Sequence, residues 1–170
     1  LGAMTIVEII DYFNGFFTIK NFIKTRSKKG LLWIFAILAF ILSAIIDNLT
    51  ATIVLITILQ KVISDRDTRL WFAGLIIVAA NAGGAWSPIG DVTTTMLWIG
   101  DKVTTLSLIS YVLVPSIICL IIPVGIASFL PAFQGEIEEA KPDEGDVGFH
   151  KHGARMLYLG LSAIVFVPVF

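Results

Sequence analysis

The chain of 170 residues is 56% hydrophobic and 15% charged, against about 25% charged residues in soluble domains, and this excludes an ordinary soluble protein. Its mean hydropathy of +0.90 indicates an all-α membrane protein. A formal net charge of −1 argues against a nucleic-acid partner, because no surplus of Lys and Arg is available to contact phosphates.

The N-terminal part, residues 1–18, predicts the end of a membrane helix, and a basic loop follows it at 19–30. Glu8 lies near the end of that helix, where it either faces a transport pathway or lies near water. Lys and Arg concentrate on the cytoplasmic side of membrane proteins. We therefore expect the loop to be cytoplasmic.

The apolar block at residues 31–60 fits neither one membrane span of about 20 residues nor two of about 40 with a turn. Both of its flanks are basic, including the loop 61–69, so both ends are expected in the cytoplasm. A re-entrant helical hairpin with its tip at 47–50 satisfies length and charge together. One long tilted helix with a buried Asp47 is the alternative.

The next block, residues 70–100, would form a straight helix of about 46 Å, against a membrane core of about 30 Å. Three glycines and a proline interrupt it between residues 83 and 90. Because glycine and proline at this density break helices, we predict half-helices at 70–82 and 92–100 with irregular backbone at 83–90. This block is interpreted as a broken transmembrane helix.

The C-terminal part predicts a transmembrane helix at residues 107–131 and a charged cytoplasmic linker at 134–155. The uncharged run 156–170 is shorter than a span of about 20 residues, so we interpret it as the start of the next transmembrane helix. We therefore expect the sequence to be an internal piece of a longer multi-pass membrane protein.

Two ionisable residues, Asp47 and Asp91, lie inside the apolar blocks. A charge at membrane depth costs at least about 2.5–3.5 kcal/mol on insertion scales, so each needs a reason. One reason is structural, because each Asp precedes a helical stretch that it could cap. The other is ion binding, because the neighbouring polar side chains offer oxygen and none is a thiol or an imidazole. These neighbours include Asn48, Thr50, Asn81, Thr93 and Thr94, with Ser43, Ser87 and Glu8 as candidate pathway residues.

Such oxygen-rich sets bind hard cations and suit Na⁺ or Li⁺ better than zinc or copper. Removing a carboxylate from water favours its neutral form, so a proton can replace the metal ion. We therefore expect Na⁺ at Asp47 and Asp91 in competition with H⁺. Competition at one site couples the opposite fluxes of the two ions, and it requires neither a cofactor nor an enzymatic reaction.

Two segments of the sequence resemble the NhaD-type Na⁺/H⁺ antiporters of the ion transporter superfamily, which also contains arsenite permeases and dicarboxylate symporters. These are SAIIDNLT at 43–50 and NAGGAWSPIGDVTTT at 81–95. The resemblance covers most of the chain and implies part of an inverted-repeat transporter that works by alternating access, each repeat holding a re-entrant hairpin and a broken helix. Carried over by position, it implies an ion site of Asp47, Asn48, Thr50, Asn81, Asp91, Thr93 and Thr94.

Two other functions are weighed against Na⁺(Li⁺)/H⁺ exchange. An anion permease for arsenite or a dicarboxylate is one, since helix N-termini favour anions, but two carboxylates oppose it. An intramembrane aspartyl protease is the other, although Pro88 departs from the Gly-x-Gly-Asp pattern before Asp91. As partners we expect membrane lipid, Na⁺, H⁺ and a second copy in a homodimer, and as location the bacterial inner (plasma) membrane.

Overall fold

The computed structural model of the chain describes residues 27–136, which form five α-helices and one short 3-10 helix. The elements are α3 (Lys28–Ile46), α4 (Asn48–Val62), α5 (Arg66–Ala85), α6 (Val92–Ile99), α7 (Thr105–Ala127) and η1 (Pro131–Phe133). Outside the described residues lie the expected helix 1–18 with Glu8, the run 156–170, and most of the loop 19–30 and of the linker 134–155.

Three of the helices, α3, α5 and α7, are long and apolar enough to cross a membrane. They have 19, 20 and 23 residues. At 1.5 Å per residue they reach about 28, 30 and 34 Å, close to the membrane core of about 30 Å. The helix α4 is shorter, with 15 residues. The described part of the chain is therefore helical with three candidate membrane spans, as its hydropathy predicts.

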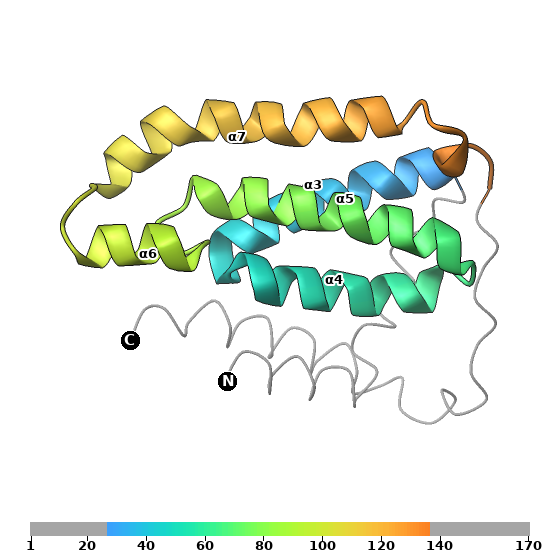
Figure 1. The fold of residues 1–170 in the computed structure, drawn as a ribbon, viewed down its shortest axis with the longest axis horizontal. Helices are drawn as coiled ribbons and strands as arrows, with labels where there is room; N and C mark the ends of the chain where they lie inside the picture. Colours follow the sequence, from blue (N-terminus) through green and yellow to red (C-terminus); the bar gives the residue numbers. More distant parts are fainter. Residues whose placement is uncertain (1–26, 137–170) are drawn as a thin grey trace, which may run out of the picture.

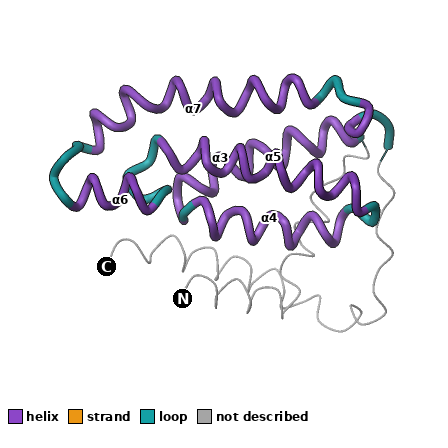
Figure 2. The backbone as a smooth tube through the Cα atoms, viewed as in Figure 1, coloured by secondary structure: helices purple, strands orange, loops and turns teal. Residues whose placement is uncertain are grey.

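The helices α3 and α4 run side by side in opposite directions, joined at Asp47 (Figure 1). The helix α5 runs in the same direction as α3 and packs against both α3 and α4. After the α5–α6 connection (residues 86–91), α6 continues in that direction, and α7 runs back along the molecule (Figure 2). As a result, the α3–α4 junction and the α5–α6 connection lie beside each other, partway along α7.

Small side chains bring α3 and α5 into close contact. Ala39 and Ser43 of α3 are fully buried, as are Ala79 and Ala80 of α5. A Cβ atom on Gly83 would stand 2.1 Å from the carbonyl oxygen of Phe40 in α3, so only glycine fits there. Membrane helices associate through small residues of this kind, because these let the two backbones approach.

The bounds of α5 and α6 differ from the expected half-helices at 70–82 and 92–100. The helix α5 continues to Ala85, so Gly83 and Gly84 are helical and the irregular backbone begins at Trp86. Glycine lowers helix stability by about 1 kcal/mol relative to Ala, but here it allows the contact with α3. These two glycines therefore serve packing between helices and do not break α5.

The helix α7 also differs from the segment expected at 107–131, because it spans Thr105–Ala127. It ends where Ser128 donates both its backbone amide and its hydroxyl to the carbonyl of Val124 in the last turn. Pro131 then begins η1, whose Phe133 packs against Phe72 of α5 with ring centroids 5.1 Å apart. This contact fixes the end of α7 beside the start of α5.

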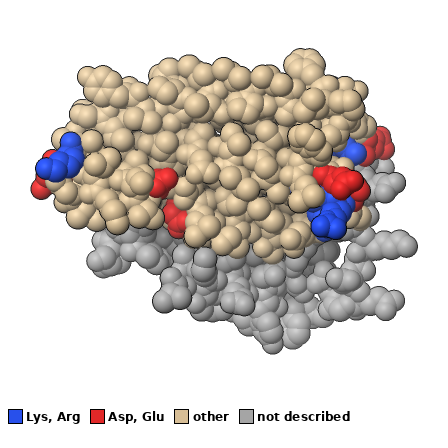
Figure 3. Space-filling model, in the orientation of Figure 1, with Lys and Arg blue, Asp and Glu red and all other residues tan. Residues whose placement is uncertain are grey.

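Charged side chains in the described part of the chain gather at its two ends (Figure 3). One end carries Lys28, Lys29, Asp65, Arg66, Asp67, Arg69 and Glu136, and the opposite end carries Asp101 and Lys102. Between the ends, within residues 27–136, the charged residues are Asp47 and Asp91. The two carboxylates thus lie within the apolar length of the helices.

Candidate functional site

Asn48 joins the two polar segments of the chain. Its backbone amide donates to the carbonyl oxygen of Gly90 at 3.0 Å. Its side-chain Nδ2 donates to Asn81 Oδ1 at 3.0 Å and to Asp91 Oδ2 at 3.1 Å. We call Asn48, Asn81 and Asp91 the amide cluster. The structure therefore places the start of α4 against the end of α5 and the start of α6.

Asp47 forms the junction between α3 and α4 in an unusual backbone conformation. Its φ of 129° and ψ of 157° lie where glycine is the usual residue. Such strain costs on the order of 1–3 kcal/mol and persists only where the surroundings enforce it. The carboxylate caps α4, since Oδ1 accepts from the Thr50 amide at 2.7 Å and Oδ2 from the Thr50 hydroxyl at 2.8 Å.

Asp91 caps α6 in a similar way. Its Oδ1 accepts from both the amide and the hydroxyl of Thr93, each at 2.9 Å. The hydroxyls of Thr94 and Thr95 donate to the Asp91 carbonyl, at 2.9 and 2.8 Å. The capping explanation is thus present in the structure for both Asp residues. Asp91 differs from Asp47 because its Oδ2 also accepts from Asn48, in another helix.

The amide cluster is an oxygen-rich position that the other described residues cover only in part. Asp47, Asn48 and Asp91 are half-buried, whereas Asn81 is exposed. The Asn48 amide group, which carries partial positive charge, lies between an amide oxygen and a carboxylate oxygen. Because two oxygens converge on that point and one belongs to a carboxylate, the point attracts positive charge. A small cation at the same place would meet ligands of the kind that hard cations prefer.

The two candidate pathway serines lie next to the amide cluster, in tight packing. Ser43 is fully buried, and its hydroxyl donates to the carbonyl oxygen of Ala80 across the α3–α5 contact. Ser87 is also buried, and its hydroxyl accepts from the Ile89 amide at 3.4 Å within the α5–α6 connection. Both hydroxyls therefore make contacts that shape the backbone around the cluster.

Gly84 and Gly90 are further residues on which the site depends. A Cβ on Gly90 would lie 2.7 Å from Gly84 Cα and 2.9 Å from the Ser43 carbonyl oxygen. The absence of both side chains lets α3, α5 and the α5–α6 connection meet, and it leaves the Gly90 carbonyl facing Asn48. Sequence reasoning treated these glycines as helix breakers. The sequence signal that could have indicated their role is the position of Gly90 directly before Asp91.

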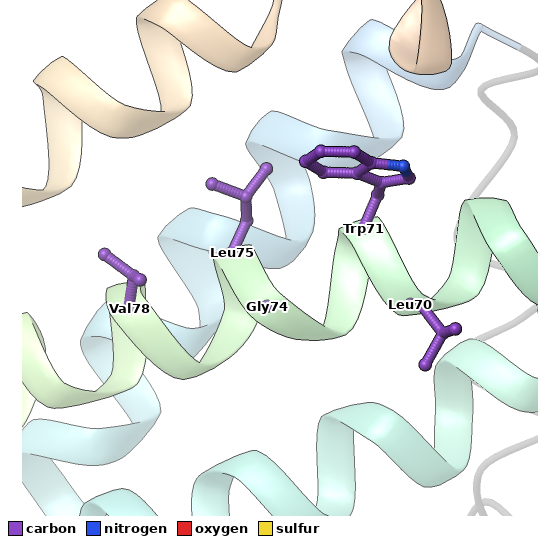
Figure 4. Close-up of a pocket in the computed structure, with 5 residues that line it drawn as sticks. All are labelled: Leu70, Trp71, Gly74, Leu75 and Val78. Carbon is purple, nitrogen blue, oxygen red and sulfur yellow. The ribbon is translucent and has the colours of Figure 1, made fainter.

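A separate groove on α5 has a different chemistry (Figure 4). Leu70, Trp71, Gly74, Leu75 and Val78 line it, around a volume of about 310 Å³. Its lining contains no carboxylate, hydroxyl or amide side chain, so it offers no side-chain ligand to a cation. Within residues 27–136, no three His, Cys, Asp or Glu side chains lie close enough together to hold a metal ion. Cation binding in this part of the chain would therefore depend on a few carboxylates supplemented by amide and hydroxyl oxygens.

The chain matches the family model described as "Citrate transporter" (CitMHS) over residues 1–170. It is 42% identical over 170 residues to "Sodium/proton antiporter 1" of Arabidopsis thaliana, a match that covers 100% of this chain and 30% of that protein. It is 40% identical over 105 residues to "Na(+)/H(+) antiporter NhaD" of Vibrio parahaemolyticus, which covers 61% of this chain and 25% of that protein.

A second protein named "Na(+)/H(+) antiporter NhaD", from Vibrio cholerae, is 32% identical over 173 residues, with 100% of this chain and 36% of that protein covered. The chain thus spans less than half the length of the curated relatives it matches. No solved structure matches the chain.

Proposed function

The chain belongs to the citrate transporter (CitMHS) family, and from this we propose that it is one part of a secondary transporter that exchanges Na⁺ or Li⁺ for H⁺. The names of the matched relatives support exchange of Na⁺ for H⁺. One observation in the structure carries the proposal. The amide cluster unites Asp91 with the side-chain amides of Asn48 in α4 and Asn81 in α5, inside the apolar length of the molecule.

In this proposal α3 and α4 form a re-entrant hairpin, and α5 and α6 form a broken transmembrane helix. The return of α4 toward the end where α3 begins supports the hairpin. The basic residues at that end support its placement in the cytoplasm, because Lys and Arg concentrate there. The inverted-repeat partner of this unit would lie in the rest of the protein, since the matched relatives are more than twice as long.

Ion exchange would occur by competition at the amide cluster and at Asp47. When Na⁺ binds, the Asn48 side chain turns so that its Oδ1 replaces its Nδ2, and the ion lies between this oxygen and the oxygens of Asn81 and Asp91. A proton on Asp91 removes the negative charge that attracts Na⁺, so the two ions exclude each other. Thr50 and Thr93 hold the carboxylates in position. Alternating access then carries the loaded site from one side of the membrane to the other.

An anion permease is the second candidate, because the family description names citrate, an anion. The position of Asp47 and Asp91 opposes it, since two carboxylates repel an anion. The names of the family and of the relatives indicate a transporter, and not a protease. The relatives include a plant protein as well as bacterial ones, so they do not favour the bacterial inner membrane over other membranes. A homodimer remains part of the proposal.

The proposal is tested with the full-length protein in proteoliposomes that contain a pH-sensitive dye. Addition of Na⁺ or Li⁺ outside the proteoliposomes should drive protons out of their interior, toward the side to which the cation was added, and addition of K⁺ should not. The assay is repeated with citrate, succinate or arsenite present. Proton movement that ignores Na⁺, or that occurs only with one of these solutes, would contradict cation exchange.

Replacement of Asn48 by Ala is expected to weaken Na⁺ binding while transport remains. The substitution removes both side-chain hydrogen bonds of the cluster but keeps the backbone bond to Gly90. Loss of one amide ligand should raise the Na⁺ concentration for half-maximal exchange by about tenfold, the factor that corresponds to about 1.4 kcal/mol. Thr57→Ala is the matched control, because the Thr57 hydroxyl bonds only locally, to Ile53 of the same helix. Equal Na⁺ dependence in both variants would remove Asn48 from the site.

A further inference from the structure

A second pocket of the molecule lies far from the amide cluster, where the end of α4 meets the start of α5. Its volume is about 420 Å³, within the range of small-molecule sites. Its polar wall is formed by Gln60, Arg66 and Arg69, and its apolar wall by Ile56, Leu59, Leu70 and Ala73. The pocket therefore combines two guanidinium groups with aliphatic walls.

The two arginines lie three positions apart on α5, so they project from the same side of the helix. Arginine presents a planar fork of N–H groups that matches the oxygens of a phosphate. Arg66 is exposed and Arg69 is half-buried, so both remain accessible from outside. This arrangement favours an anionic ligand with several oxygens.

The apolar part of the pocket indicates what else the ligand carries. Leu70 is 61% exposed, although it lies beside the arginines. Figure 4 shows that Leu70 points from α5 toward α4, away from the side to which Trp71 and Leu75 point. An exposed leucine beside two cations suits a ligand with a charged head and an aliphatic chain.

The position along α5 fits the surface of a membrane. Arg66 is the first residue of a helix long and apolar enough to cross a membrane. Trp71, which is 54% exposed, lies about one turn further along, and tryptophan is enriched at the level of the lipid headgroups. The pocket is therefore at the depth where a headgroup phosphate and the start of an acyl chain are found together.

We propose that this pocket binds the headgroup and the first part of an acyl chain of an anionic phospholipid. Arg66 and Arg69 bind the phosphate, Gln60 contacts the polar headgroup, and Ile56, Leu59 and Leu70 pack against the chain. Basic pockets between membrane helices bind anionic lipids in this way. The site is separate from the ion site and does not depend on which ion the protein transports.

The carboxylates of Asp65 and Asp67 lie near the pocket and oppose an anionic ligand. The structure shows that the Asp65 carboxylate is hydrogen-bonded to Thr68. Hydrogen bonds from the side chain and the amide of Thr68 hold the pKa of Asp65 below its ordinary value of 3.8, so it is charged at neutral pH. The same bonds direct this carboxylate to the start of α5, where it serves as the N-cap. Asp67 is exposed on the first turn, and the charge of Lys28 lies near Asp65.

The test measures lipid binding to the full-length protein in non-ionic detergent by native mass spectrometry. Phosphatidylglycerol is compared with phosphatidylcholine of the same acyl chains, and with inorganic phosphate as the free anion. The variant Arg66→Gln/Arg69→Gln is compared with Lys102→Gln, which removes an exposed cation at the opposite end of the described helices. Arg66→Lys/Arg69→Lys keeps both charges but removes the planar forks.

Wild type and Lys102→Gln should bind phosphatidylglycerol in preference to phosphatidylcholine, and the Gln pair should lose about tenfold or more of that binding, because two charge-assisted contacts are removed. The Lys pair should bind more weakly than wild type and better than the Gln pair. Equal phosphatidylglycerol binding by wild type and the Gln pair would overturn the proposal. So would complete displacement of the lipid by inorganic phosphate at equal concentration.

Discussion

Asp91→Asn is expected to reduce Na⁺-driven proton movement to the background level while the full-length protein remains folded in the membrane. The substitution separates the two explanations for this residue. Asn is as good an N-cap as Asp, so its side-chain oxygen can still accept from the Thr93 amide and preserve the start of α6. It cannot carry the negative charge that attracts Na⁺ or take up the proton that replaces it.

Asp47→Asn should have the same effect for the same reason. Asn has nearly the same shape as Asp, and its side-chain oxygen can still accept from the Thr50 amide, so the strained junction at φ 129° should be retained. Asp101→Asn is the matched control, because Asp101 also has positive φ, 54°, but lies exposed at one end of the described helices. Proteoliposome exchange is measured at equal amounts of inserted protein. Normal exchange by Asp91→Asn would show that capping alone accounts for this residue.

Asp91→Glu is a graded version of the same experiment. The charge is kept, but the carboxylate moves by about one methylene away from Asn48 and the Thr93 amide. Exchange should persist with an altered Na⁺ concentration for half-maximal activity.

Gly83→Ala is expected to destabilise the protein strongly, although it adds one methyl group. The new Cβ would lie 2.1 Å from the Phe40 carbonyl oxygen and 2.6 Å from Phe40 Cα. Both are backbone atoms, so no side-chain rotation relieves the contact and the helices α3 and α5 must move apart. Overpacking costs typically about 1–3 kcal/mol, and the loss of unfolding free energy should lie at the upper end of that range.

Gly74→Ala is the matched control on the same helix. A Cβ at Gly74 would have no heavy atom within 4 Å, so the change should be neutral or stabilise α5 by up to about 1 kcal/mol. The measurement is the unfolding temperature of the full-length protein in detergent, with exchange activity in parallel. If both variants unfolded at the same temperature, the close approach of α3 and α5 would not be a main source of stability.

The sequence predicts where the helices end and begin better than it predicts the contacts between these helix ends. With its tip at 47–50, the expected hairpin has a first arm that ends at Ile46, and α3 ends at the same residue. This end could be predicted because Asp47, a polar residue in an apolar block, is a local signal. The start of α6 at Val92 likewise follows from Asp91 and the threonines after it. Such signals depend on neighbours within one helical turn, and a single sequence displays them.

The contacts around the amide cluster depend on residues that lie far apart in the sequence. Asn48 contacts residues 33 and 43 positions away, and no local periodicity indicates such a pairing. The same limit applies to Gly83. The density of glycine and proline around it predicts a break in the helix, because its contact with Phe40 in α3 cannot be read from the local sequence. The resemblance to a transporter family grouped the polar residues into one site, and their hydrogen bonds are visible only in three dimensions.

The bond between the Asn48 amide and the Gly90 carbonyl belongs to the main chain, and this has an evolutionary consequence. Side-chain substitutions other than those at Gly84 and Gly90 leave such a bond in place, so mutation can vary the chemistry around it without separating the two helix junctions. A scaffold of this kind can acquire a new selectivity by changing only the side chains that face the ligand. The backbone contact between the two helix junctions can then be retained while the selectivity for the ligand changes.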